Sequence, residues 1–292
     1  MSVWQAIEKQ LQEVLGEPVP LSTPRSVGGG SINQSCRVHS GSHAWFVKLN
    51  SADRLDMFAA EAEGLEALRK ADALCIPRPL CHGQDGRQAW LVMEYLETGG
   101  SGSATALAEG LAAIHRVGST RFGWHRDNTI GSTAQVNTPE TDWLTFWREH
   151  RLAFQLRLAA RNGAPARSLD TGEQLLAQLP ALLDGHDPQP SLLHGDLWSG
   201  NYAYTRDGRP TIFDPAVYFG DREADLAMTE LFGGFSRDFY AAYQNAWPLE
   251  DGYPLRRTLY NLYHVLNHFN LFGGGYLSQA QGMMESLLSE VR

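Results

Sequence analysis

Residues 192–201 read LLHGDLWSGN, and a second short stretch, TIFDP, follows at residues 211–215. Together they contain Asp196, an asparagine five positions later at Asn201, and a second aspartate at Asp214. Phosphoryl transfer uses such a set, with one carboxylate as base and two oxygen ligands for Mg²⁺. Asp and Asn in turns usually satisfy their own backbone, so the signal lies in the spacing of all three. The pattern predicts Asp196 as the base and Asn201 and Asp214 as the magnesium ligands.

Two short apolar runs precede these polar residues, one at 192–193 and one at 212–213. A turn-like segment, TRDGR, lies between them at 205–209. This arrangement predicts a small hairpin whose two arms each end on a polar residue at the mouth of a cleft. Such a hairpin would bring Asp196, Asn201 and Asp214 together.

Composition and charge narrow the class of protein. The chain has 292 residues, 43% hydrophobic and 20% charged, which is typical of a globular protein large enough for two lobes. Its formal charge of -9 argues against a general nucleic-acid binder. The spacing of Cys36, Cys75 and Cys81 is not that of a disulfide framework or a zinc site. The sequence has no apolar run long enough to predict export or a membrane span. We therefore expect a cytoplasmic protein that binds neither nucleic acid nor membrane.

A glycine-rich tip lies between two strand-like runs near the N-terminus, at Gly28, Gly29, Gly30 and Ser31. Glycines let a backbone approach phosphate groups and donate N–H groups to them. A flexible turn would have the same composition, so by itself this tip is weak support for a nucleotide site. We assign these four residues as candidate phosphate contacts.

The run 44–49 has strand character and places Lys48 among apolar residues. The residues that follow, 53–70, have helical spacing, with Glu61 on the same face as Leu65. A lysine on a strand is often a surface residue whose stem packs on the sheet. The alternative is that Lys48 contacts nucleotide phosphates and is held by Glu61, because a carboxylate on an apolar helix face requires a cation.

A buried strand is predicted at 89–96, followed by a Gly- and Ser-rich stretch at 98–103. That change of composition is the best domain boundary, so we expect one lobe at 1–96 and a second at 97–292. Met93, Glu94 and Tyr95 would then offer backbone groups to adenine, although an ordinary strand and linker would look the same. Helical spacing at 103–115, 141–162 and 171–183 predicts a largely helical second lobe.

Several motifs resemble the fructosamine kinase (ketosamine 3-kinase) family, which is related to the aminoglycoside and choline phosphotransferases. They are GGGSIN at 28–33, EAEGL at 61–65, DNTIGS at 127–132, HGDLWSGN at 194–201 and DPAVYFGDRE at 214–223. The resemblance covers nearly the whole chain. DLWSGN and NTIGS are its specific parts, whereas His-Gly-Asp alone would indicate only the broader group.

The resemblance implies an α+β, two-lobed protein-kinase-like fold, with an N-terminal antiparallel sheet plus helix and a mainly helical C-terminal lobe. It implies an ATP- and Mg²⁺-dependent kinase that phosphorylates the sugar 3-hydroxyl of ketosamines, free or attached to protein. Trp198 would form part of the sugar platform, although a buried packing role is equally compatible with an indole. Asp225 would brace the catalytic loop.

Two positions depart from the family pattern. Asp221 stands where we expect a histidine, and a carboxylate near the cleft would favour cationic amines. Ser31 stands where some relatives carry a cysteine that can bridge two chains, so we expect no such redox switch. Two other functions remain open: another small-molecule kinase of the same fold, and a nucleotide-binding module without activity. The oligomeric state is not predicted.

Overall fold

The computed structural model describes residues 2–28 and 32–291. The chain forms two compact units. Unit 1 contains residues 1–103 and 202–215, and unit 2 contains residues 104–201 and 216–292. This division differs from the predicted boundary at 96/97, because the segment 202–215 interrupts unit 2 in sequence and belongs to unit 1. Asp214 therefore belongs to unit 1, although Asp196 and Asn201 belong to unit 2.

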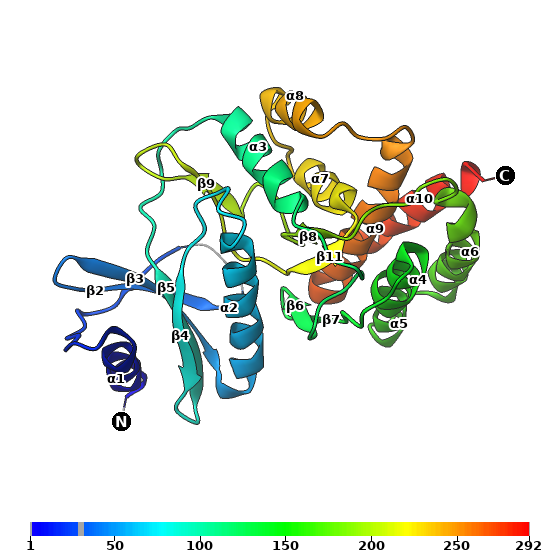
Figure 1. Cartoon of the computed structure of the whole chain (residues 1–292). Coiled ribbons are helices and arrows are strands. Elements are labelled where there is room, and N and C mark those ends of the chain that lie inside the picture. Colours follow the sequence, from blue (N-terminus) through cyan, green and yellow to red (C-terminus); the bar gives the residue numbers. More distant parts are fainter. Residues whose placement is uncertain (1, 29–31, 292) are drawn as a thin grey trace. The chain divides into compact units, whose positions relative to one another are not determined.

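Unit 1 is built on a five-stranded antiparallel sheet with the strand order β1-β2-β3-β5-β4. The strands are β1 (Arg25–Ser26), β2 (Gln34–Ser40), β3 (His43–Ser51), β4 (Pro79–Gln84) and β5 (Gln88–Glu94). Helix α1 (Val3–Leu15) and helix α2 (Leu55–Arg69) lie on either side of this sheet (Figure 1). Local sequence explains α1, because Ser2 and Gln5 form a capping box and Gly16 ends the helix in a left-handed conformation.

Side-chain alternation along β3 divides its residues between two environments. Trp45, Val47 and Leu49 pack with Ile7 and Leu11 of α1 in one apolar cluster. Because successive side chains in a strand point to opposite faces, Lys48 faces the other side, where α2 lies. The predicted strand and helix in this region are therefore present, with α2 preceded by a single 3₁₀ turn at Ala52–Arg54.

The segment 202–215 joins unit 1 as a hairpin of β9 (Tyr202–Tyr204) and β10 (Pro210–Ile212). Its position is fixed by backbone contacts, since the Cys75 N–H donates to the carbonyl of Pro210 at 3.0 Å. The predicted hairpin between 192–193 and 212–213 is wrong. Strand β8 (Ser191–Leu193) instead pairs with β11 (Tyr218–Gly220) in unit 2. Strands β8 and β10 are only three residues long, so distant partners rather than the intervening turn decide their pairing.

Unit 2 is mainly helical. Its helices are α3 (Ala104–His115), α4 (Trp143–Trp147), α5 (Ala153–Arg161), α6 (Ala166–Leu182), α7 (Arg222–Leu231), α8 (Arg237–Ala246), α9 (Tyr253–Phe272) and α10 (Tyr276–Ser289). A short hairpin of β6 (Asn128–Ile130) and β7 (Thr133–Gln135) completes it. The predicted single helix at 141–162 is present as α4 and α5, joined by a π-helical turn at Arg148–Leu152.

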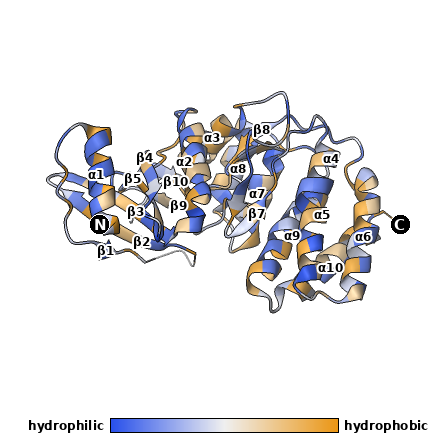
Figure 2. Cartoon of the chain, turned by 90° about the horizontal axis from the view of Figure 1, so that it is seen from below, coloured by the Kyte–Doolittle hydropathy of each residue, from blue (hydrophilic) through white to orange (hydrophobic). Residues whose placement is uncertain are grey.

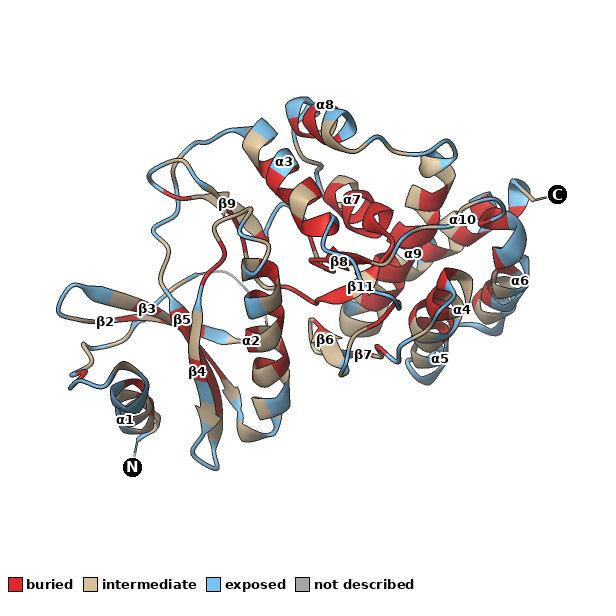
Figure 3. Ribbon diagram, in the orientation of Figure 1, coloured by how far each residue is buried: buried red, intermediate tan, exposed pale blue. Residues whose placement is uncertain are grey.

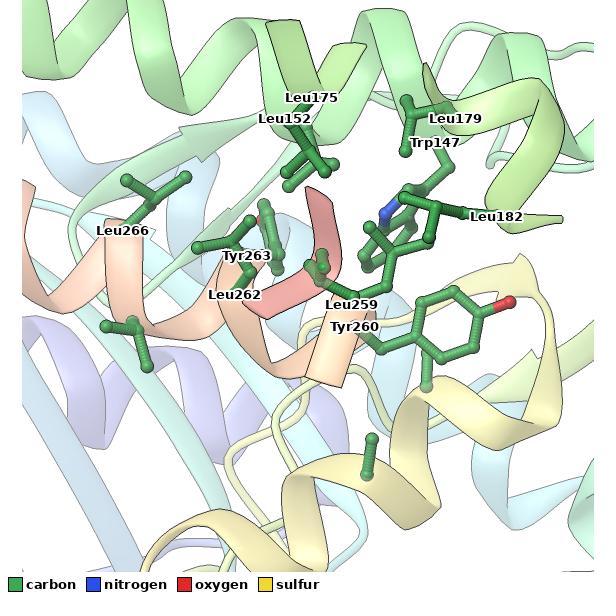
Figure 4. Packing of buried hydrophobic residues seen from close by; sticks show 14 of the residues in the cluster. Trp147, Leu152, Leu175, Leu179, Leu182, Leu259, Tyr260, Leu262, Tyr263 and Leu266 are labelled. Atoms are coloured by element: carbon green, nitrogen blue, oxygen red, sulfur yellow. The ribbon is translucent and has the colours of Figure 1, made fainter. Parts of the chain in front are cut away.

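The core of unit 2 surrounds α9. Figure 4 shows Leu259, Tyr260, Tyr263 and Leu266 of α9 among leucines of α6 and the indole of Trp147. Buried residues concentrate in β8, β11, α7 and α9 (Figure 3). The outer helices α6 and α10 carry both hydrophobic and hydrophilic residues, as expected for helices with one face on the core (Figure 2). Burial of these apolar faces therefore stabilises unit 2, which contains β8 and the residues that follow it.

Within residues 2–28 and 32–291, helices that combine the length and the apolar character of a transmembrane segment are not found.

Candidate active site

One group of candidate residues lies in unit 1 and centres on Lys48. Its ammonium group donates to Glu61 Oε1 at 2.5 Å and to Asp214 Oδ1 at 2.8 Å. The lysine is only 4% exposed, so its charge is balanced by carboxylates rather than by water. The predicted pairing of Lys48 with Glu61 is present, and Asp214 is a second partner from a distant segment.

Electrostatics keep this lysine charged. Burial by itself lowers the pKa of Lys48, but the negative charges of Asp214 and Glu61 outweigh it, and the net pKa lies above its ordinary value. Burial raises the pKa of Glu61, and Lys48 opposes that change. A permanent cation is therefore held beside Asp214, which suits a group that contacts phosphate oxygens.

Asp214 itself has an unusual backbone conformation. Its φ of 58° lies in the left-handed region, which non-glycine residues seldom occupy. The side chain is 42% exposed, and its second oxygen, Oδ2, meets no hydrogen-bond donor among residues 2–28 and 32–291. A half-exposed carboxylate with one free oxygen can serve as a ligand for a hard cation such as Mg²⁺.

Another group of candidate residues lies in unit 2, on the loop after β8. Asp196 is half-buried, and its N–H donates to His194 Nδ1 at 3.2 Å. The side-chain amide of Asn201 donates to the carbonyl of Asp196 at 2.9 Å, with Oδ2 of Asp196 at 3.4 Å. With its NH₂ group engaged in this way, Asn201 turns its other atom, Oδ1, away as a candidate oxygen ligand.

Asp225, on α7, fixes the start of this loop. Its carboxylate accepts the N–H groups of His194 at 2.7 Å and Gly195 at 2.8 Å, and it lies 3.1 Å from His115 Nε2. Burial raises the pKa of Asp225, but the hydrogen bond and charge of His115 outweigh it, so the net pKa is lowered. The expected bracing role of Asp225 is therefore observed, and His115 is a packed residue whose Nδ1 lies 2.7 Å from the Tyr243 hydroxyl.

The remaining predicted nucleotide contacts are placed as follows. Gly28 is exposed, while Gly29, Gly30 and Ser31 lie outside the described residues. Met93 is buried in β5, and the N–H groups of Glu94 and Tyr95 donate to the carbonyls of Arg78 and Ala44. These two N–H groups are therefore already used in hydrogen bonds within unit 1. Contacts from residues 93–95 to adenine stay a prediction, and they would have to use other backbone groups of this segment.

Comparison with known proteins identifies the family. The model of the fructosamine kinase family matches residues 3–290. The chain belongs to this family. A probable ketoamine kinase from Synechocystis sp. is 48% identical over 288 residues, covering 98% of this chain and 97% of the relative. A protein-ribulosamine 3-kinase, chloroplastic, from Arabidopsis thaliana is 40% identical, covering 94% of this chain and 85% of the relative.

Solved structures agree with the family. The crystal structure of a candidate fructosamine-3-kinase from Haemophilus somnus matches with a TM-score of 0.89 and 30% identity, covering 98% of this chain and 97% of that one. The aminoglycoside phosphotransferase APH(4)-Ia, in complex with ADP and hygromycin B, matches with a TM-score of 0.63 and 18% identity, covering 97% of this chain and 98% of that one. The predicted family and the predicted protein-kinase-like fold are confirmed.

In this fructosamine kinase family member, Trp198 follows Asp196 by two positions and is 37% exposed. Its ring packs edge-on against Phe232, with centroids 6.3 Å apart. Ser199 Oγ donates to the carbonyl of Phe232 at 3.1 Å, which fixes the same contact from the loop side. Gly200 lies beneath the indole, where a Cβ atom would come within 2.3 Å of the ring. The indole is therefore partly exposed rather than buried, and it packs against Phe232 and Gly200.

The structure corrects the expectation for Asp221, the position where the family pattern led us to expect a histidine. Its side chain is buried, accepts the hydroxyl of Tyr260 at 2.5 Å, and lies 2.6 Å from His186 Nε2. It also caps α7, because Oδ1 accepts the N–H of Glu223 at 3.0 Å. A carboxylate with these partners is part of the core of unit 2 and is not available to select a cationic amine.

Sequence reasoning missed three residues that support the site. Phe232 holds the Trp198 ring, and the amide side chains of Asn128 and Gln135 contact the chain just after Asp214 and Pro215. Phe232 carried no signal, because an aromatic residue at a helix end usually belongs to the core. Asn128 lies in the family-specific loop, so its importance was visible but its partner was not.

Proposed function

We propose that this chain is an ATP-dependent kinase that phosphorylates the sugar 3-hydroxyl of ketosamines. Membership of the fructosamine kinase family supports the reaction class, as do the names of the ketoamine and ribulosamine kinases to which it is similar. The observation that carries the proposal is the buried Lys48, held between Glu61 and Asp214 in a chain that also keeps Asp196 and Asn201. A module that had lost activity would not need to retain all five groups.

In this proposal each residue has a separable role. Lys48 contacts nucleotide phosphates as a fixed cation, and Glu61 orients it. Asp196 accepts the proton of the attacking hydroxyl, since its loop is fixed by the Asp225 hydrogen bonds to His194 and Gly195. Within its own unit each side chain is held by hydrogen bonds, which lowers the entropy cost of orienting it toward a reactant.

The oxygen donors of Asp214 and Asn201 fit Mg²⁺, which prefers carboxylate and amide oxygens and keeps several waters. Both donors have an oxygen left over from their protein contacts. When bound, the ion would neutralise charge on the nucleotide phosphates. In the complex named above, APH(4)-Ia binds ADP, and we infer nucleotide use for this chain as well.

The acceptor assignment rests on Trp198. An exposed indole two residues after the base offers a flat surface for the apolar face of a sugar ring. We infer that the ketose lies on this ring with its 3-hydroxyl toward Asp196. The formal charge of -9 and the bacterial relatives are compatible with a cytoplasmic enzyme that acts on small or protein-bound ketosamines.

A panel of acceptors with labelled ATP tests the proposal. We expect phosphate transfer to fructosyllysine or ribulosyllysine, with the product carrying phosphate on the 3-hydroxyl by NMR. Transfer to choline or an aminoglycoside, with none to either ketoamine, would replace the proposal with another small-molecule kinase. Asp196→Asn is the control, and equal background turnover by both proteins on every acceptor would indicate a nucleotide-binding module.

A further inference from the structure

The segment that follows Asp214 and Pro215 is held by two amide side chains from the β6–β7 hairpin. Asn128 Nδ2 donates to the carbonyl of Val217 at 2.8 Å, and Gln135 Nε2 donates to the carbonyl of Ala216 at 3.1 Å. Asn128 and Gln135 are direct partners in the hairpin, so both amides reach the segment from one place. These four residues belong to unit 2.

The orientation of the two amides is set by a chain of further hydrogen bonds. The Tyr263 hydroxyl donates to Gln135 Oε1 at 2.8 Å, so the NH₂ group of Gln135 must face Ala216. Asn137 Nδ2 donates to Asn128 Oδ1 at 2.9 Å, which turns the NH₂ group of Asn128 toward Val217. Neither the Asn128 nor the Gln135 side-chain amide can exchange its oxygen and nitrogen positions without losing a hydrogen bond.

A buried arginine anchors this network. Arg151 is 0% exposed, and its guanidinium nitrogen Nη2 donates to Asn137 Oδ1 at 2.8 Å. Its guanidinium lies 4.1 Å from the ring centroid of Tyr218 and 4.6 Å from that of Phe146. The π-helical turn at Arg148–Leu152 carries this side chain into the core. The network therefore ends on a cation fixed between aromatic rings rather than on a mobile surface group.

The other side of segment 216–217 contacts the loop that follows β8 and contains Asp196. The N–H of Ala216 donates to the carbonyl of His194 at 2.8 Å. Gly195 has a φ of 82°, and a Cβ atom there would lie 2.0 Å from the carbonyl oxygen of Ala216. Ala216 is thus confined between the loop that carries Asp196 and the amides of the β6–β7 hairpin.

This confinement bears on Asp214, which is two residues upstream and has a φ of 58°. Such a conformation persists only where the surroundings impose it. On the N-terminal side, Ile212 pairs with Tyr202 in the β9–β10 hairpin. On the C-terminal side, Pro215 has a restricted φ and Ala216 is held as described. Asp214 is therefore preceded by a strand-paired residue and followed by a proline and by a residue whose N–H and carbonyl are both hydrogen-bonded.

We propose that Asn128 and Gln135 are positioning residues for the carboxylate of Asp214. By holding the carbonyls of Ala216 and Val217, they fix the direction in which the chain leaves Pro215, and hence the aim of the Asp214 side chain. This inference rests on the magnesium role of Asp214 in the proposed function. It also assigns Asn128, in the family-specific loop at 127–132, a role that is separate from acceptor recognition.

Gln135→Leu tests the proposal, with Gln155→Leu as matched control. Gln155 is equally buried, has amide partners in Asn267 and Asn270, and also interacts with Tyr263, but within residues 2–28 and 32–291 it has no hydrogen bond to 216–217. Mg²⁺-dependent binding of a non-hydrolysable ATP analogue is measured by calorimetry, together with kcat, KM for ATP and Tm. We expect Gln135→Leu to raise the Mg²⁺ concentration for half-maximal binding at least fivefold and to lower kcat. Gln155→Leu should lower Tm similarly and leave the Mg²⁺ dependence unchanged.

Asn128→Ala is the second variant, to be used if Gln135→Leu does not fold. It removes the donor to Val217 and the oxygen that accepts from Gln135 and Asn137, and we expect the Mg²⁺ concentration for half-maximal binding to rise as well. An unchanged Mg²⁺ dependence in the folded variants would overturn the proposal and leave both amides with a purely structural role. Binding is measured without an acceptor, so a failed acceptor panel overturns the proposed function alone. Absence of Mg²⁺-dependent binding by the wild type overturns both.

Discussion

Lys48 and Asp214 are 166 positions apart in sequence, yet Lys48 Nζ lies 2.8 Å from Asp214 Oδ1. The contact is possible because the 202–215 segment joins unit 1, where β3 presents Lys48 on its α2 face. A buried cation is thereby attached to the candidate metal ligand.

Lys48→Met should lower kcat/KM at least about 100-fold, because a fixed phosphate contact is lost. It should also destabilise the fold by about 3–5 kcal/mol, because Glu61 is left buried without a cation. Turnover and urea unfolding measure the two effects. In the double variant with Glu61→Gln, the free energies of unfolding should fall short of additivity by about 0.5–3 kcal/mol. Strict additivity would show that the pair is not coupled.

Asp196→Asn should lower kcat by about 10²–10⁴-fold, the range over which a general base contributes. The amide keeps the size of the carboxylate, so Tm and nucleotide affinity should stay near those of the wild type. The exposed Asp170→Asn serves as control for the loss of one negative charge. A variant that retains most of its kcat would remove Asp196 from the role of base.

Trp198→Ala should raise KM for a ketosamine about tenfold and leave KM for ATP unchanged, since an aromatic contact is worth about 0.5–1.5 kcal/mol. The ring is 37% exposed and contacts mainly Phe232, so the loss of stability should be small. Trp198→Phe should restore part of the affinity. Equal increases in both KM values would instead indicate a general disturbance of the loop.

His186 should make the protein less stable as the pH rises above neutrality. Burial lowers the pKa of His186, but the hydrogen bond and charge of Asp221 outweigh it, and the net pKa is raised. A raised folded-state pKa gives stability that is complete below the unfolded value of about 6.5 and is lost as the pH passes the folded value. Urea unfolding between pH 6 and 9 measures the loss.

His186→Gln should flatten that decline, because a neutral amide at this place does not titrate. The exposed His39→Gln is the matched control and should retain the wild-type pH dependence. A decline of equal slope in His186→Gln would assign the effect to another group.

His264 should produce the opposite dependence on the acid side. Burial, with a further contribution from the nearby His268, lowers the pKa of His264 to about 3. Because the unfolded chain then binds a proton that the folded chain excludes, stability should fall by about 1.4 kcal/mol per pH unit below about pH 6.5. Unfolding between pH 6.5 and 5 measures this. His264→Gln should reduce the slope, and an unchanged slope would contradict the prediction.

Much of unit 1 could be predicted from local patterns. Helical spacing predicted α2, strand character predicted β3, and a charged pair on apolar faces predicted the contact of Lys48 with Glu61. The spacing of Asp196, Asn201 and Asp214, with the surrounding motifs, indicated the family. Periodicity and short motifs are local properties, so a single sequence states them directly.

Tertiary contacts decided the rest. The three-residue strands β8 and β10 chose partners other than each other, and the 202–215 segment joined unit 1 across a boundary that composition had placed elsewhere. Asp221 became a buried hydrogen-bond acceptor although its neighbours in sequence suggested a cleft. The sequence alone determined which chemical groups the chain carries and the order in which they occur. Only the tertiary structure decided which of them meet, because a short strand, a buried carboxylate or an amide has no local preference strong enough to select a distant partner.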